Sequence, residues 1–210
     1  MELDIVVKTN RNTSVCIDIN EPLENYFSIM DKYSFQFSIH IFGKAKLAAE
    51  VVGIALDERK IKSDGLIMKD LADGYSRDAY LAINSLVRSN MYTKELDDDI
   101  ANACLCTCYI DRVYVEPSHR NKGIGKYVFN NLRSILSLSL NLQTRYFVIY
   151  PFPEQPYKNK NNRIEWIQTP DRGGSNKKLM IDVLTKAGYE RIGKTRFFAL
   201  NCTISPKTLN

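Results

Sequence analysis

The stretch VEPSHRNKGIG at residues 115–125 constrains this chain most, because it joins a strand-like segment to a helix-like one through a turn with two glycines. Residues 109–115 alternate and are rich in β-branched and aromatic types, which favours a strand, and Pro117 ends strand pairing because it lacks a backbone donor. From Lys126 onward, apolar residues recur at helical spacing and predict an amphipathic helix that lies on a sheet. These residues are Val128, Leu132, Ile135, Leu136 and Leu142.

The turn between the two elements has the properties of an anion site. Gly123 and Gly125 lack a Cβ, so a ligand can approach the backbone closely and unusual φ values are tolerated. The first turn of a helix carries partial positive charge and unpaired N–H groups, to which Arg120, Lys122 and Lys126 add full charges. We therefore expect a pyrophosphate here. The alternative is a basic turn before an ordinary helix.

Among the known phosphate motifs, neither the Walker A loop nor the three-glycine dinucleotide fingerprint fits this spacing. The segment instead resembles motif A of the GNAT superfamily of acyl-CoA N-acyltransferases, written V-x-P-x-x-R/Q-x-x-G-x-G/A. Val115, Pro117, Arg120, Gly123 and Gly125 match it in register. The resemblance covers about residues 35–200, apart from two insertions. It implies a single α/β domain over residues 1–210, with a mixed central sheet flanked by helices and insertions at about 60–102 and 151–176.

The rest of the pattern agrees with that architecture. Residues 35–42 and 47–56 predict a hairpin with a turn at Gly43, and residues 23–32 predict a short helix ahead of it. Within residues 63–102, helical spacing of Tyr80, Ile83, Leu86 and Val87 predicts a helical insertion. Residues 145–150 predict a strand parallel to 109–115, because a strand, helix, strand order implies a right-handed crossover.

Toward the C-terminus we expect one helix and a closing hairpin. Ser175 can cap a helix over 176–187, with Leu179, Val183 and Ala187 as its stripe and Gly188 as its left-handed end. Two short strands follow at 189–193 and 195–202. The proline-rich, aromatic segment 151–176 is predicted to be a functional loop, a candidate lid that binds the acceptor; a mobile surface excursion is the alternative.

The resemblance also implies where a cofactor would lie. Family members insert pantetheine between two splayed strands, which places it on the backbone of Val113, Tyr114 and Val115. The pyrophosphate would then contact Arg120 and the amides from 121 to 126. The residues that would offer these amides are Asn121, Lys122, Gly123, Ile124, Gly125 and Lys126.

Catalysis in such a fold is direct attack of an amine on the thioester, so the protein must supply a base, an oxyanion site and an acid. A period of two places Tyr109, Asp111, Val113 and Val115 on one face of the central strand. The family often carries a carboxylate on this face, which makes Asp111 the first candidate base. The alternative is a surface or paired aspartate beside Arg112. Weaker candidates in the long segment are Glu154 and Glu165.

The general acid that would protonate the departing thiolate cannot be assigned by the family pattern. The position that carries a tyrosine in the family is Leu184 in this chain. Either Tyr150, Tyr157 or water replaces it, or the protein is a weak or non-acetylating member. Tyr189 is predicted to be a core residue. The two histidines are predicted to have no catalytic part: His119 is exposed in the motif turn and His40 belongs to a strand.

Composition narrows the class of protein further. A chain of 210 residues with 44% hydrophobic residues suits one domain. No long apolar run or signal-peptide layout is present, so we expect a cytoplasmic protein without membrane contact. The net charge of +5 is dispersed, so nucleic-acid binding is not required.

The remaining clusters predict no metal. Cys104, Cys106 and Cys108 would lie roughly 6.5–7 Å apart along a strand, too far for one zinc ion, and are interpreted as small apolar packing residues. The aspartates at 97–99 lack calcium-loop spacing and predict a solvated turn.

We therefore expect an N-acetyltransferase with acetyl-CoA as co-substrate and an amine-bearing acceptor, either a small molecule or a protein. A second hypothesis is a non-catalytic module that binds or senses acyl-CoA, suggested by Leu184. A third is nucleic-acid binding by the basic segment 158–163 with Tyr157 and Trp166. The acceptor and the oligomeric state, including a homodimer, are left open by the sequence.

Overall fold

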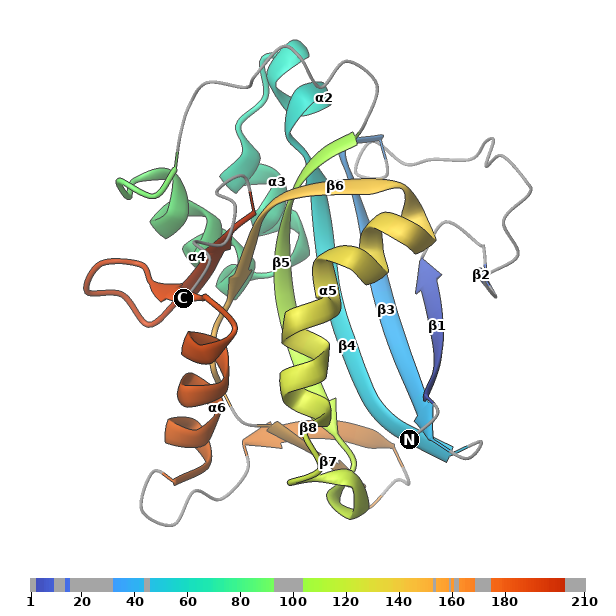
Figure 1. Ribbon diagram of the computed structural model, residues 1–210. Helices are drawn as coiled ribbons and strands as arrows, with labels where there is room; N and C mark the ends of the chain where they lie inside the picture. The colour runs from blue at the N-terminus through green and yellow to red at the C-terminus, as the bar shows by residue number, and fades with distance from the viewer. Residues whose placement is uncertain are drawn as a thin grey trace, which may run out of the picture.

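A computed structural model describes residues 3–9, 14–15, 32–43, 46–92, 104–152, 154–158, 160, 163–168 and 175–202. Eight strands form one sheet in the order β2-β1-β3-β4-β5-β6-β10-β9 (Figure 1). Their bounds are β1 Leu3–Thr9, β2 Ser14–Val15, β3 Ser34–Gly43, β4 Lys46–Asp57, β5 Cys104–Val115, β6 Leu142–Ile149, β9 Glu190–Arg191 and β10 Phe198–Asn201. The short helix predicted at 23–32 and the aspartates at 97–99 lie outside the described residues, apart from Lys32.

The strand pairing is mixed, as predicted. β3 and β4 form the expected antiparallel hairpin, and β4 pairs antiparallel with β5. β5 and β6 are parallel, and α5 (Ile124–Leu140) provides the crossover between them. β10 then returns antiparallel to β6. The predicted fold class, a mixed α/β sheet flanked by helices, is thus confirmed.

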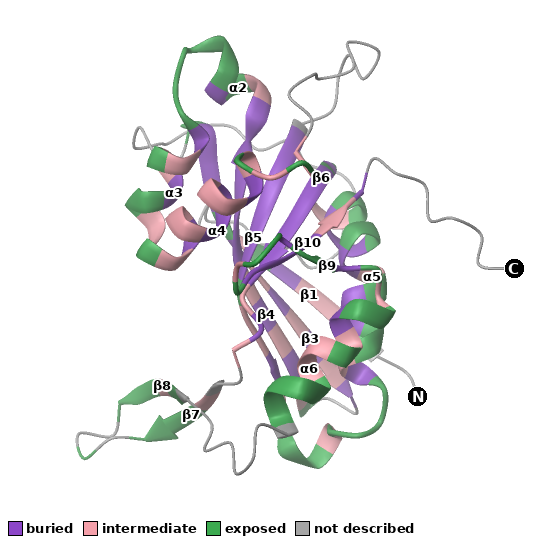
Figure 2. Ribbon diagram, turned by 90° about the vertical axis from the view of Figure 1, so that its left-hand side faces the viewer, coloured by how far each residue is buried: buried purple, intermediate pink, exposed green. Residues whose placement is uncertain are grey.

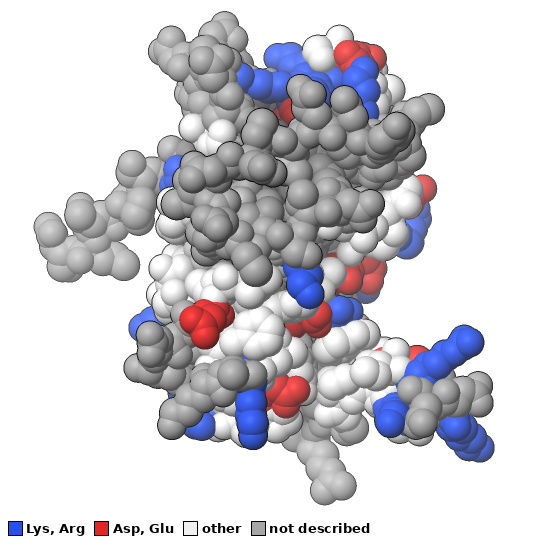
Figure 3. All heavy atoms as spheres, turned by 90° about the vertical axis from the view of Figure 1, so that its right-hand side faces the viewer, with Lys and Arg blue, Asp and Glu red and all other residues white. Residues whose placement is uncertain are grey.

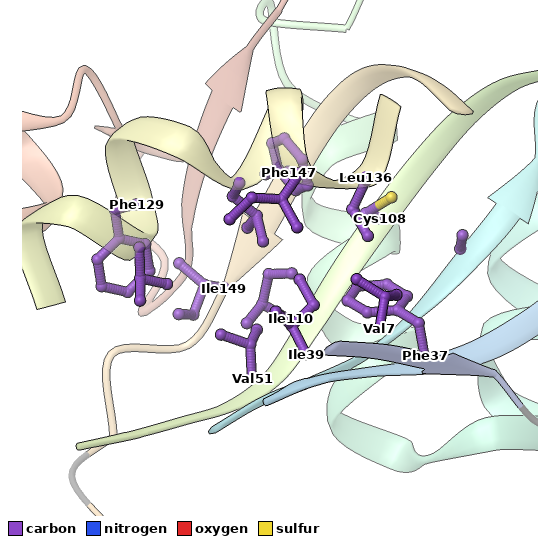
Figure 4. Packing of buried hydrophobic residues seen from close by; sticks show 14 of the residues in the cluster. Val7, Phe37, Ile39, Val51, Cys108, Ile110, Phe129, Leu136, Phe147 and Ile149 are labelled. Atoms are coloured by element: carbon purple, nitrogen blue, oxygen red, sulfur yellow. The ribbon is translucent and has the colours of Figure 1, made fainter. Parts of the chain in front are cut away.

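The helix α5 covers one face of the sheet. Its apolar stripe points at the strands, and Figure 4 shows Phe129 near Ile149 and Leu136 near Cys108. Burial of each such side chain contributes on the order of 1.5–3 kcal/mol. The buried residues of the helix are Ile124, Val128, Phe129, Leu132, Ile135 and Leu136. The helix ends at Leu140, since Asn141 is left-handed with φ 51°, so Leu142 belongs to β6 and the prediction that placed it in the helix stripe is wrong.

The opposite face is covered by three short helices, α2 (Glu58–Ser63), α3 (Met68–Tyr75) and α4 (Arg77–Val87). α3 and α4 confirm the helical structure expected within 63–102, whereas α2 precedes that span; residues 93–102 lie outside the description. Ile83 and Leu86 of α4 are fully buried against the sheet. In Figure 2 the strands form a buried layer between these helices and α5. A second core therefore lies on this side.

The last helix, α6 (Ser175–Lys186), begins within one residue of its prediction, and Gly188 has the expected positive φ of 87°. The predicted stripe is wrong at its start, because Leu179 is 56% exposed. Leu184 takes the central place instead and is fully buried, with Val183 and Ala187 partly buried beside it. The apolar contact of the helix therefore begins at Met180 and not at Leu179.

Residues 151–176 differ from the predicted loop. They contain an antiparallel hairpin of β7 (Glu154–Lys158) and β8 (Ile164–Gln168), separate from the main sheet. Pro156 is opposite Trp166 in it; a two-stranded sheet has free edges, so a residue without an N–H donor is tolerated there. In Figure 2 this hairpin projects away from the main sheet.

Candidate active site

The two central parallel strands separate at their carboxyl ends. The last pair joins Ile110 of β5 to Ile149, where β6 ends. β5 continues to Val115 and remains paired with β4 on its other edge. In the part of the chain that the structure describes, no strand pairs with the β6-side edge of residues 111–115. Backbone donors and acceptors on that edge can therefore pair with an extended ligand.

A β-bulge lies next to this fork. Val52 is opposite Arg112 and Gly53 is opposite Ile110, so Asp111 is an extra residue with no partner on β4. Bulges of this kind redirect side chains and often lie beside active sites.

The bulge changes the alternation of β5, and one prediction fails because of it. Tyr109, Asp111, Val113 and Val115 do not share a face. Tyr109 belongs to the buried cluster on the α4 side, whereas Val113 and Val115 pack against the cluster under α5. An extra residue inverts the phase of every residue after it, and no sequence pattern marked its position.

A cavity of about 220 Å³ opens at the fork. The three predicted catalytic candidates, Asp111, Tyr109 and Tyr150, all line it. They meet because they come from the carboxyl ends of adjacent parallel strands or from the residue that follows. The other lining residues are Asp78, Phe152 and Arg196.

Asp111 supplies a carboxylate at the mouth of the cavity. The residue is exposed, yet the protein atoms around it partly desolvate the carboxylate and raise its pKa above the ordinary value; Arg112 opposes this shift and Asp78 adds to it. Its side chain makes no hydrogen bond or ion pair with another described residue. A carboxylate with a raised pKa and free lone pairs is suited to accept a proton.

The two tyrosines of the cavity differ in environment. Tyr109 is 2% exposed, and burial raises its pKa well above the ordinary value, with the charge of Asp111 adding to the shift. Its phenol therefore stays protonated. Tyr150 is half-buried, stacks on Phe152 at 5.1 Å between ring centroids and meets Phe197 edge-on at 5.8 Å. These contacts fix the Tyr150 ring beside Asp111.

Arg196 closes one side of the cavity. Its Nη2 donates to Asp78 Oδ1 at 2.6 Å, and its guanidinium lies 4.5 Å from the ring centroid of Tyr150. Arg196 comes from the turn before β10 and Asp78 from the first turn of α4, so the ion pair joins two elements distant in sequence.

The predicted phosphate turn has the backbone that close approach requires. After a short 3₁₀ helix (Pro117–His119), Asn121 and Gly123 have φ values of 59° and 81°. Gly123 is the N-cap of α5 and has no side chain to cap the helix, so the first-turn N–H groups gain no partner from that position. A Cβ built at Gly123 or Gly125 would meet no atom within 4 Å. The space above these glycines is open.

Two cations of the turn, Arg120 and Lys122, donate hydrogen bonds to nearby backbone carbonyls. Arg120 Nε donates to the carbonyl of Val115 at 2.9 Å, and Lys122 Nζ to the carbonyl of Ser118 at 2.7 Å. Lys126 is exposed in the first turn of α5. Ile124, by contrast, buries its side chain in the core and can offer only its backbone. The turn thus keeps its positive charge near the helix start.

Trp166 of the hairpin packs on β5. The guanidinium of Arg112 lies 3.8 Å from the ring centroid of Trp166, and Tyr114 meets the same ring edge-on at 5.2 Å. Because the ring of Trp166 already contacts Arg112 and Tyr114, it is not available to stack on a nucleic-acid base, which weighs against the nucleic-acid hypothesis. The hairpin nevertheless ends in the exposed cations Lys158, Lys160 and Arg163. Figure 3 shows Lys and Arg side chains gathered on a projecting arm of the molecule.

The positions of three tyrosines and one leucine bear on the identity of the general acid. Leu184 is buried in the core and cannot reach the cavity. Tyr189 is also buried there, as predicted. Tyr157 is 49% exposed on β7 and does not line the cavity. Of the tyrosines considered as replacements, Tyr150 alone lies beside Asp111.

The remaining predicted residues have other contacts. His40 of β3 pairs with Glu50 at 3.2 Å, away from the cavity, as expected for a strand residue. His119 is bonded to Ser118 at 3.0 Å and half-buried, not exposed. Glu165 is exposed on β8; the side chain of Glu154 lies outside the description. Cys106 and Cys108 are buried in the core, which confirms the packing interpretation for these two.

Sequence reasoning missed Asp78, Phe152 and Arg196. Asp78 follows the helix cap Ser76, where an acidic residue has an ordinary explanation through the helix dipole. Arg196 lies in a surface turn among other charged residues. Only the tertiary arrangement shows that they meet.

Comparison with known proteins is limited. No family model matches the chain, and no curated protein sequence matches it. Among solved structures, an agmatine N-acetyltransferase mutant in its apo form is similar with 10% identity and a TM-score of 0.35, over 78% of this chain and 75% of that one. A polyamine N-acetyltransferase of Drosophila melanogaster is similar with 9% identity and a TM-score of 0.35, over 78% and 74%. At these values neither likeness bears on what this chain binds.

Metal clusters and membrane-spanning helices are both absent from the described part of the chain. No group of three or more His, Cys, Asp or Glu there is arranged to hold a metal ion. None of the helices described is long and apolar enough to cross a membrane.

Proposed function

We propose that this chain is an acetyl-CoA-dependent N-acetyltransferase. The observation that carries the proposal is the fork between β5 and β6. Among the described strands, none pairs with the β6-side backbone edge of residues 111–115, and this edge lies beside the start of α5, where Gly123 is the N-cap. One end of this arrangement suits an extended amide chain and the other suits a pyrophosphate. Between them lies a cavity that contains a carboxylate.

The residues fit the co-substrate. Val113, Tyr114 and Val115 would pair with pantetheine through their backbone, and the amides of 121–126 would bind the pyrophosphate with Arg120, Lys122 and Lys126. The open space above Gly123 and Gly125 supports this fit, because a side chain at either position would point into it. Acetyl-CoA supplies the activated acyl group.

The proposed chemistry is one displacement. Asp111 accepts a proton from the acceptor's ammonium, directly or through water, and the free amine attacks the thioester carbonyl. A C–N bond forms and the C–S bond breaks. The nitrogen releases its second proton to solvent as the departing sulfur receives one, so an amide and a free thiol result. Tyr150 is the proposed proton donor, since its ring is fixed beside Asp111. Tyr109, which stays protonated, forms one wall of the cavity.

A thermal-shift measurement tests binding of the co-substrate. Acetyl-CoA should raise the Tm of the wild type by mass action, and Gly123→Val should abolish the rise, because a β-branched residue disfavours φ 81° and occupies the ligand's approach. Gly65→Val is the matched control: its φ is 69°, its Cβ also meets no atom within 4 Å, and it lies in the turn after α2. No shift in the wild type at millimolar acetyl-CoA would reject the proposal.

One alternative keeps the binding and removes the reaction. Leu184 lies in the core where the family pattern has a tyrosine, which favours a non-catalytic module that binds acyl-CoA. Thiol release with a panel of amines separates the two: retained acetyl-CoA binding without any release supports the binding module.

A further inference from the structure

The cavity at the fork is polar and carries an unequal set of charges. Two carboxylates, Asp78 and Asp111, line it with one guanidinium, Arg196. Its net formal charge is therefore −1, counted over these lining residues. Its other walls are the aromatic residues Tyr109, Tyr150 and Phe152. Carboxylates with aromatic faces are the groups that hold organic cations in proteins.

Arg196 is itself a cation bound by some of these carboxylate and aromatic groups. It is bound to Asp78 at 2.6 Å, and it lies 4.5 Å from the ring centroid of Tyr150 and 5.3 Å from that of Phe197. The carboxylate and the aromatic ring that a ligand's cation would use on this side are thus taken by the protein's own side chain. The pair is about half exposed, 45% for Arg196 and 48% for Asp78, which places it toward the mouth.

A further cation lies on the same side. Lys177 Nζ of α6 is 5.9 Å from the ring centroid of Tyr150, although Lys177 does not line the cavity. A ligand with a second positive charge near Tyr150 would therefore face Arg196 and Lys177 together. Like charges in partly desolvated sites repel strongly.

Asp111, by contrast, remains available. Within the described part of the chain, its side chain makes no hydrogen bond or ion pair. The cavity can accordingly neutralise one more positive charge, at Asp111. Its volume of about 220 Å³ is below the range of about 300–1,000 Å³ that holds drug-sized ligands. The ligand must be small.

We propose that the acceptor is a small amine with a single positive charge, held at Asp111, and that Arg196 is the residue that excludes diamines by neutralising Asp78 and covering Tyr150. This inference rests on the proposed acetyl transfer for its assignment of Asp111. Removal of Arg196 would expose a second carboxylate and an aromatic face. The cavity would then carry a net charge of −2 and accept a second ammonium where the guanidinium lies.

The test compares two acceptors of equal length, 1-aminobutane and 1,4-diaminobutane, with the wild type and Arg196→Met. We expect the wild type to favour the monoamine in kcat/KM, measured by thiol release at saturating acetyl-CoA. Arg196→Met should shift the ratio toward the diamine at least tenfold. Lys194→Met removes one positive charge from the same turn outside the cavity and should leave the ratio unchanged. An unchanged ratio in Arg196→Met, or an equal shift in Lys194→Met, overturns the inference.

Two further measurements keep the outcome clear. In the Arg196→Met background, Asp78→Asn should reverse the gain for the diamine, because the exposed carboxylate is its cause. Calorimetric binding of both amines to each variant gives the same comparison without turnover. If no thiol is released but Arg196→Met shifts the binding ratio, the proposed reaction fails and the charge selectivity stands; if binding does not shift, the selectivity fails. Arg196→Met should fold, since a half-exposed ion pair contributes little to stability.

Discussion

At the scale of single residues, the carboxylate of Asp111 determines how activity should depend on pH. Partial desolvation raises its pKa in the folded protein, and Asp78 adds to the shift. A base must be deprotonated to act, so activity should fall as the pH drops through this raised pKa.

Asp111→Asn should reduce kcat/KM by about 10²–10⁴-fold, the usual contribution of a general base. The loss should be largest on the acidic side of the profile where wild-type Asp111 is still ionised, because there the acceptor is almost entirely an ammonium. It should shrink as the pH rises and free amine becomes abundant. A ratio of mutant to wild-type rate that is constant across pH would return Asp111 to a structural role.

Tyr150 offers a matched pair of phenol deletions. Tyr150→Phe keeps the ring contacts with Phe152 and Phe197 and removes the proposed proton donor, so kcat should fall by about 10²-fold or more while acetyl-CoA affinity is unchanged. Tyr157→Phe makes the same change on β7, outside the cavity, and should have wild-type kinetics. Equal rates for both variants would assign the proton to water.

The sequence predicts the site residues only where they lie at the ends of the two strands that α5 connects. Asp111 and Tyr150 follow from the ends of two adjacent parallel strands, which must meet at one edge of the sheet. Asp78 and Arg196 come from a helix and a turn whose positions depend on tertiary packing. Each has an ordinary local explanation, so no sequence pattern could distinguish it.

At the scale of elements, the bulge in β5 depends on Gly53. A Cβ at this position would lie 2.5 Å from the carbonyl oxygen of Tyr109 and 2.7 Å from the ring of Phe37. Glycine is therefore required by close approach.

Gly53→Ala should lower the free energy of unfolding by about 1–3 kcal/mol, the usual cost of overpacking. Because it displaces the backbone just before Asp111, it should also reduce kcat. Gly125→Ala is the stability control, since its Cβ meets no atom within 4 Å; urea unfolding should give a value close to the wild type. A Gly53→Ala variant with wild-type stability and activity would contradict the strain at the bulge.

The hairpin β7–β8 should affect the acceptor more than the co-substrate. Trp166 packs on Arg112 and Tyr114 next to the extra residue of the bulge, whereas the phosphate turn lies elsewhere. Replacing residues 158–174 with a few glycines should raise the acceptor KM and leave the acetyl-CoA dissociation constant unchanged. Wild-type values for both would show that the hairpin is only a surface excursion.

The elements differ in how far the sequence predicts them, for physical reasons. The long strands β3, β4, β5 and β6 and the helix α5 have apolar patterns of clear period, and the sequence predicts them. The strands β1 and β2 are not among the predicted elements. The bulge adds one residue without changing composition. The hairpin contains Pro156 and polar residues, and it gains order from Trp166 packing on β5, a contact distant in sequence.

At the scale of the whole molecule, a buried ion pair connects the sheet to the helices on its α4 side. Glu58 of α2 accepts a hydrogen bond from Arg145 Nη1 of β6 at 3.0 Å, and it is also bonded to Thr107 of β5 and Tyr92. Both side chains of the pair are almost inaccessible, 4% and 3% exposed. Burial raises the pKa of Glu58, opposed by Thr107 and by Arg145.

Arg145→Met should destabilise the protein by about 3–5 kcal/mol at neutral pH, because it leaves a buried carboxylate without its cation. A folded-state pKa above the unfolded value means that the folded state binds the proton more tightly, so the stability is highest below the unfolded pKa and is lost as the pH rises through the folded pKa. Loss of Arg145 raises that pKa further. The destabilisation measured by urea unfolding should therefore be larger at neutral pH than in mild acid, and Glu58→Gln added to Arg145→Met should remove the pH dependence. An equal loss at both pH values, or no recovery in the double variant, would show that Arg145 contributes by packing alone.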